Sequence, residues 1–147
     1  GNHDGEIEPV LAGLDHDTTV TGAGGVRLGS VGFVHGHTWP DADLLGAEVV
    51  CVGHEHPAVR LEDSVGGRRT ERVWLRGTVD RSAFQDQYDD LPGKEGSLVV
   101  FPAFNDRSGG SRVNVENEFL SPFLPDGLGN GEAYLVDGTR LGAIETL

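Results

Sequence analysis

Two short apolar runs, each followed by histidines two residues apart, stand out in the pattern of apolar and polar positions. The runs span residues 31–34 and 49–52, and the histidines that follow them are His35, His37, His54 and His56. A β-branched run closed by glycine predicts a buried strand that ends at the rim of a sheet. Residues two apart on an extended segment project to the same side. Each pair therefore presents two imidazoles at the place where open α/β sheets bind their ligands.

Short apolar stretches and turn signals alternate along the rest of the chain. Strands are expected at 18–26, 27–35, 48–53, 57–63, 70–76, 98–102, 131–136 and 140–144, with turns at Gly24-Gly25, Gly66-Gly67 and Asp137-Gly138. A short helix is expected at 41–47, directly after Pro40. The acidic stretch 80–94 predicts a loop or an irregular helix. Many short strands with few helices indicate one part of a layered α/β protein.

Length and composition bound the kind of protein. The 147 residues suit one domain or less, and because the chain begins with Gly1 in the middle of a motif we expect it to be a piece of a longer protein. No secretory signal and no apolar run near the ~20 residues of a membrane helix are present in the sequence. Cys51 is the only cysteine, so a cytoplasmic setting without disulfides is expected. Its place inside an apolar run predicts a small buried hydrophobe.

The charge balance is strongly acidic. The chain has 24 acidic and 11 basic residues and a net charge of -13, which argues against a general electrostatic grip on nucleic acid. A nucleic-acid substrate is still compatible, because metal ions in a cleft receive a phosphate locally. An acid-rich, lysine-poor composition also suits a protein that works in concentrated salt, so we expect a halophilic, archaeal source.

The histidine pairs are candidates for a metal site. Imidazole is a common metal ligand, and an ion needs several side chains that converge from separate strands. Two other interpretations remain open: His-x-His arises by chance at strand ends, and a cupin-like barrel uses it around one ion. The barrel would leave the opening GNHD motif unexplained.

Three motifs in order give the chain a family resemblance. Gly1-Asn2-His3-Asp4, His35-Gly36 and Gly53-His54-Glu55-His56 resemble the last three metal motifs of the calcineurin-like metallophosphoesterases. The family's first two motifs, Asp-x-His and Gly-Asp, are absent and are expected just upstream of Gly1. The stretches PAFN (102–105), GG (109–110) and LVDGTRLG (135–142) resemble one branch, which comprises archaeal phosphoesterases related to the repair nuclease subunit and the bacterial ligase-associated DNA-damage phosphoesterase.

The resemblance implies a fold and a set of roles. The fold would be an α/β layered β-sandwich flanked by helices, with residues 1–147 as a single domain that forms the C-terminal part. Asn2, His35 and His54 would be ligands of one metal ion, and His56 would be a ligand of the other. His3 would face the phosphate as general acid or charge stabiliser, and Asp4 would orient it. His37 is expected either beside the substrate and ligands or as a spectator.

The resemblance further implies metal-dependent hydrolysis of a phosphoester, above all a phosphodiester, with DNA or RNA among the candidate substrates. Two divalent ions are expected, manganese first, with iron, zinc or nickel as the other candidates, because nitrogen and oxygen ligands suit them. The alternative is a metal-binding module or scaffold without catalysis. Without the upstream motifs, this chain alone is expected to hydrolyse little. Outside the site, we expect Glu55 and His16 in solvent, Phe104 and Asn105 in core packing or a turn, and the arginines of 68–76 on a solvated face.

Overall fold

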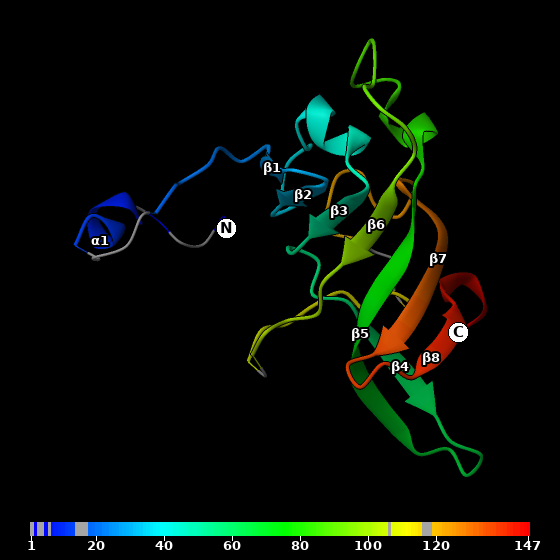
Figure 1. Ribbon diagram of the computed structural model, residues 1–147. Coiled ribbons are helices and arrows are strands. Elements are labelled where there is room, and N and C mark those ends of the chain that lie inside the picture. Colours follow the sequence, from blue (N-terminus) through cyan, green and yellow to red (C-terminus); the bar gives the residue numbers. More distant parts are fainter. Residues whose placement is uncertain (1, 3–4, 6, 14–17, 106, 116–118) are drawn as a thin grey trace.

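Eight strands and a few short helices make up the fold (Figure 1). The computed structural model describes residues 2, 5, 7–13, 18–105, 107–115 and 119–147. The strands are β1 (Val26–Leu28), β2 (Val31–Val34), β3 (Val49–Val52), β4 (Ala58–Glu62), β5 (Arg68–Val79), β6 (Ser97–Val100), β7 (Leu128–Leu135) and β8 (Arg140–Ala143). They form one sheet in the order β1-β2-β3-β6-β5-β7-β8, and β4 pairs with β5.

The helices are short. They are the α-helix α1 (Glu8–Leu11) and the 3-10 helices η1 (Ala42–Gly46), η2 (Arg81–Phe84) and η3 (Ile144–Thr146). The fold is therefore β-rich, and the helices expected to flank a layered sandwich are not found in the described part of the chain. None of the described helices is long and apolar enough to cross a membrane.

Three parallel strands lie next to one another in the sheet. In their register, Val34 of β2 lies beside Val52 of β3, which lies beside Val100 of β6. The three strands therefore end level with one another, and the residues that follow them leave at the same edge of the sheet. The prediction that each histidine pair follows a strand is confirmed, but the strands are buried on one face only, since Phe33 of β2 is 43% exposed.

The first predicted strand pair is wrong in its boundaries. The chain turns at Gly29-Ser30, between β1 and β2, and the residues from 18 to 25 are not a strand. Gly25 has a φ of +99°, and a Cβ there would lie 2.4 Å from the carbonyl oxygen of Phe33. Gly25 is therefore needed for a close approach of two backbones rather than for a hairpin turn.

The β4–β5 hairpin and the final β7–β8 hairpin are confirmed. β5 is long because its first residues pair with β4, and its later residues pair with β6 on one side and β7 on the other. In Figure 1 the β4–β5 hairpin extends beyond the rest of the sheet, away from the end at which β2, β3 and β6 begin.

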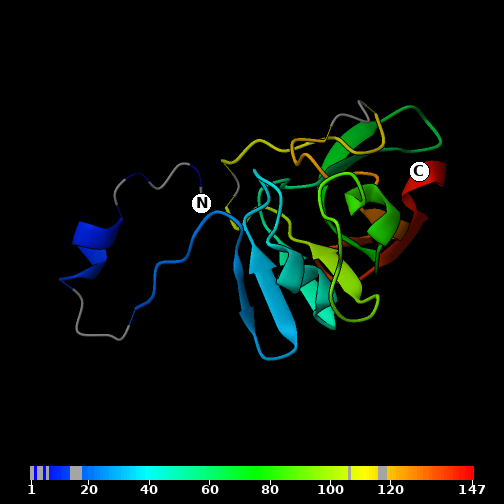
Figure 2. The same cartoon turned by 90° about the horizontal axis from the view of Figure 1, so that it is seen from above.

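The core packs against one face of the sheet. Leu44 and Leu45 of η1 are almost fully buried. The short helix expected at 41–47 is thus present between β2 and β3, as a 3-10 helix. The rings of Phe84, at the end of η2, Trp39 and Phe123 form a triangle, with centroids 5.7–6.2 Å apart. Burial of these rings supplies much of the apolar area that stabilises the fold. Figure 2 shows η1 and η2 lying close to the central strands.

Candidate metal centre

The two histidine-bearing loops are tied together by backbone hydrogen bonds at the level edge of the parallel strands. The N–H groups of Gly53 and His54 donate to the carbonyl oxygen of His35, across 3.0 and 2.6 Å. This connection continues the β2–β3 pairing by one residue and holds the two imidazoles at fixed positions. The ring centroids of His35 and His54 lie 5.0 Å apart.

Three atoms that can act as metal ligands come together around Nε2 of His35. Nε2 of His35 lies 2.9 Å from Oδ1 of Asn2 and 3.2 Å from Nδ1 of His54. A ring nitrogen either carries a proton or offers a lone pair, and an amide oxygen only accepts. Nε2 of His35 therefore cannot make a full hydrogen bond with both neighbours in any one tautomer.

A shared cation would remove that conflict, because each of the three atoms then offers a lone pair. Two ligand atoms about 2.1 Å from one ion, in right-angled to tetrahedral geometry, lie about 3.0–3.4 Å apart. The observed separations of 2.9 and 3.2 Å are close to that range. The spacing of Nε2 of His35 from each of its two neighbours, and the chemistry of all three atoms, thus suit a divalent ion.

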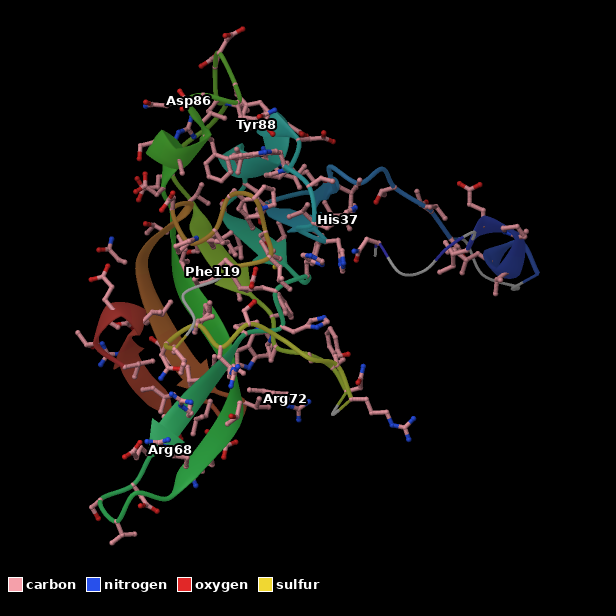
Figure 3. All side chains as sticks on the ribbon, turned by 180° about the vertical axis from the view of Figure 1, so that it is seen from behind. His37, Arg68, Arg72, Asp86, Tyr88 and Phe119 are labelled. Carbon is pink, nitrogen blue, oxygen red and sulfur yellow. The ribbon has the colours of Figure 1, made fainter. Side chains whose placement is uncertain are left out.

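His37 lies next to this cluster. Its ring centroid is 5.3 Å from that of His35 and 5.9 Å from that of His54, and Figure 3 shows its position beside the ends of β2 and β3. Its Nδ1 is buried and has no hydrogen-bond partner among the described residues. A buried nitrogen without a partner is a place where a ligand, an ion or a water molecule is expected.

Gly36 allows the two histidines of the first pair to meet the second loop. Its φ is +107°, and a Cβ would lie 2.6 Å from Cγ1 of Val52 and 3.2 Å from Oγ of Ser121. Only glycine fits both this backbone conformation and this space. The glycine of the His-Gly-His sequence is therefore required by packing.

His56 lies apart from the three-atom cluster, in a contact of its own. Its Nδ1 lies 3.0 Å from the carbonyl oxygen of Gly109. Since a carbonyl only accepts, this contact places the proton on Nδ1 and leaves the Nε2 lone pair available, which is the usual arrangement of a metal-bound histidine. The backbone of His56 is left-handed, with a φ of +48°.

Glu55 corrects one expectation. Its side chain was expected in solvent, but it is 0% exposed. The carboxylate accepts hydrogen bonds from Oγ of Ser111 and from the backbone N–H groups of Leu120 and Ser121. These partners neutralise much of the cost of burying a charge, and they fix the turn between His54 and His56.

The ligand set is incomplete in the described part of the chain. Among the described residues, no group of three or more His, Cys, Asp or Glu side chains is arranged to hold a metal ion. Besides the nitrogens of His35 and His54, the third possible metal ligand of the cluster is the amide oxygen of Asn2. His3 and Asp4, the expected catalytic residues, and His16 lie outside the described residues.

A pocket of about 630 Å³ opens beside the cluster. Its polar end includes Asn2, His35 and His37, and its apolar lining includes Phe33, Phe101 and Phe104. Cys51 also lines it, and burial raises the pKa of the Cys51 thiol. The thiol form is thereby favoured. Cys51 is only partly buried, so the expectation of a small buried hydrophobe is met in part.

The expectation of core packing or a turn is confirmed for Asn105 but not for Phe104. Asn105 forms the expected turn, since its Oδ1 accepts hydrogen bonds from the N–H groups of Arg107 and Ser108 at 2.8 and 2.9 Å. Phe104 is 92% exposed and does not pack in the core. The PAFN stretch was the only signal in the sequence that singled out this ring.

Comparisons of the chain with family models, with curated proteins and with solved structures find no match.

Proposed function

We propose that this chain carries the histidine-rich part of a two-metal phosphoesterase site, and that the reaction is hydrolysis of a phosphodiester. The observation that carries the proposal is the convergence of Asn2 Oδ1, His35 Nε2 and His54 Nδ1 at separations of 2.9 and 3.2 Å. They lie at the edge where three parallel strands end, which is where ligands bind in sheets of this kind.

The residues divide into two groups in this proposal. Asn2, His35 and His54 hold one ion, and His56 offers Nε2 to a second ion because its Nδ1 is engaged by Gly109. Ions held by these residues would neutralise the charge of the phosphate and lower the pKa of a bound water. A phosphodiester is anionic, so without this neutralisation it repels the attacking hydroxide.

His3 and Asp4 have their roles from the resemblance alone. His3 donates a proton to the departing alkoxide or a hydrogen bond to the phosphoryl oxygens, and Asp4 orients its ring. The layered sandwich with flanking helices, and the further ligands expected upstream of Gly1, belong to the same proposal. Manganese is the first candidate metal, since mixed nitrogen and oxygen ligands suit it along with iron, zinc and nickel.

A scaffold that binds metal without hydrolysis is the second candidate. It is favoured by one observation, namely that the described residues do not supply a full ligand set. The two candidates share the metal site and differ only in turnover.

The test is metal binding followed by turnover. Calorimetric titration of the chain with Mn²⁺ should show binding that His35→Gln and His54→Gln each weaken by about 10- to 100-fold or more, since each removes a ligand. His16→Gln is the matched control, because it removes an imidazole that belongs to none of the three metal motifs of the sequence. Equal Mn²⁺ affinity in all four proteins would overturn the site. Turnover of bis(p-nitrophenyl) phosphate by the natural polypeptide that contains these residues then separates the enzyme from the scaffold.

A further inference from the structure

The exposed ring of Phe104 lines the same pocket as Asn2 and His35. Phe104 is 92% exposed, the highest exposed fraction of any large apolar side chain among the described residues. It nevertheless lines the pocket that also contains Asn2 and His35. An exposed apolar ring that lines a largely apolar pocket with a few polar groups is typical of a ligand-binding surface rather than of a scattered surface residue.

A second ring supports Phe104. The ring of Phe101 lies 6.4 Å from that of Phe104 with an interplanar angle of 30°, which is an offset stack. Phe101 is in turn held by Trp74 of β5, whose ring meets it edge-on at 4.7 Å and 61°. The exposed ring is thus the outer member of a stack anchored on the central sheet.

The backbone on both sides of Phe104 is held in place. Nη1 of Arg72 donates to the carbonyl oxygen of Ala103 across 3.0 Å, and Figure 3 shows Arg72 reaching from β5 toward this loop. On the other side, Asn105 forms the turn described above. Ordering the loop in advance lowers the entropy lost when a ligand binds to the ring.

We propose that Phe104, backed by Phe101, stacks an unpaired nucleobase of a phosphodiester whose phosphate lies at the Asn2–His35–His54 cluster. This inference rests on the proposed function and names its substrate class as single-stranded nucleic acid or a nucleotide ester. Base–aromatic stacking tolerates every base, because each base has a π-face. The pocket volume of about 630 Å³ lies within the usual range for small-molecule sites.

The charge of the chain favours this mode of binding. With a net charge of -13, the protein lacks the general attraction for phosphates that most nucleic-acid-binding proteins use. Stacking depends little on charge and on salt, so it supplies affinity where the electrostatic term is unfavourable. A local ion at the cluster and an aromatic ring in the same pocket would together hold one nucleotide unit.

The experiment compares a ligand that has a base with one that lacks it. The fluorescent nucleotide 1,N6-ethenoadenosine 5′-monophosphate is titrated into the chain with Mn²⁺ present, and ribose 5-phosphate is used as its competitor. In the wild-type chain the nucleotide should bind roughly 5- to 150-fold more tightly, the range expected for one stacked base. Phe104→Ala should bring the two affinities together, and Phe104→Trp should retain the difference.

Val65→Ala is the matched control, because Val65 is 89% exposed in the turn between β4 and β5, on another part of the surface. An unchanged affinity ratio in Phe104→Ala, or a wild-type chain that does not prefer the nucleotide, overturns the stacking proposal. Failure of the metal site looks different: nucleotide binding would then be independent of both Mn²⁺ and His35→Gln, while the effect of Phe104→Ala would persist.

Discussion

The backbone N–H of Ser121 donates to Oε2 of Glu55 across 3.1 Å, although the two residues are 66 positions apart in the chain. Through this contact the loop between β6 and β7 is held against the turn that carries His54 and His56. The position of both candidate ligands therefore depends on a carboxylate that cannot itself reach the solvent.

Replacing Glu55 should destabilise the fold. Glu55→Ala leaves the N–H of the buried Ser121 and the hydroxyl of the buried Ser111 without their acceptor, and it also removes the acceptor of the Leu120 N–H. The free energy of unfolding should therefore fall by about 3 kcal/mol or more. Glu55→Gln retains one acceptor oxygen and should cost about 1–2 kcal/mol. Urea unfolding followed by tryptophan fluorescence measures both. Glu62→Gln is the control, because Glu62 forms only an exposed ion pair with Arg68 and should cost less than about 1 kcal/mol. Equal stability of Glu55→Ala and Glu62→Gln would contradict the role of Glu55.

Two adjacent glycines should respond differently to the same change. A Cβ at Gly110 would lie 1.9 Å from the carbonyl oxygen of His56, whereas a Cβ at Gly109 would meet nothing within 4 Å. Gly110→Ala should therefore displace the backbone of His56 and cost about 1–3 kcal/mol, and Gly109→Ala should be close to neutral. Thermal unfolding of the two variants provides the measurement. A Gly110→Ala protein as stable as Gly109→Ala would show that the His56 turn moves aside freely.

The hairpin formed by β7 and β8 should lose an interaction in acid. Hydrogen bonds from Arg140, and then from Tyr134, lower the pKa of Glu132 from its usual 4.5 to about 2. Because the folded pKa is the lower one, the stabilisation is present above about pH 4.5 and is lost as the pH falls toward 2. The difference in unfolding free energy between wild type and Glu132→Gln should thus shrink over that interval. Arg140→Gln should weaken the same pH dependence, because only the hydrogen bond from Tyr134 remains. A difference that stays constant down to pH 2 would exclude this assignment.

Salt should raise thermal stability. The net charge of -13 opposes the compact state by self-repulsion, which salt screens with a Debye length near ~3 Å at 1 M. The melting temperature should climb as potassium chloride is raised into the molar range. Three acids in the loop after η2 are exposed, namely Asp86, Asp89 and Asp90, and Figure 3 marks the first of them. The triple Asp→Asn variant should show a shallower climb, while a flat or falling wild-type curve would remove the case for a halophilic source.

Local pattern was sufficient for several parts of the fold. The apolar runs predicted β2 and β3 and placed His35 and His54 directly after them, because side-chain alternation and a closing glycine act within a few residues. Turn chemistry likewise predicted the hairpins around Gly66-Gly67 and Asp137-Gly138. The motif order suggested that Asn2, His35 and His54 share one site, and the structure brings these three side chains together.

Contacts between distant parts of the chain decided the rest. Gly24-Gly25 has the composition of a turn, yet Gly25 lies against Phe33 and Leu44, and no local rule distinguishes these uses of glycine. Strand alternation placed the Glu55 side chain in solvent. It is buried because its hydrogen-bond partners lie 56 to 66 residues further along the chain. The exposure of Phe104 depends in the same way on Arg72, which holds the preceding residue from another strand. The sequence by itself determined which residues carry candidate chemistry and where strands end, because those signals are local. Burial, exposure and the meeting of side chains were decided by tertiary structure, since they depend on free energies summed over segments that only folding brings into contact.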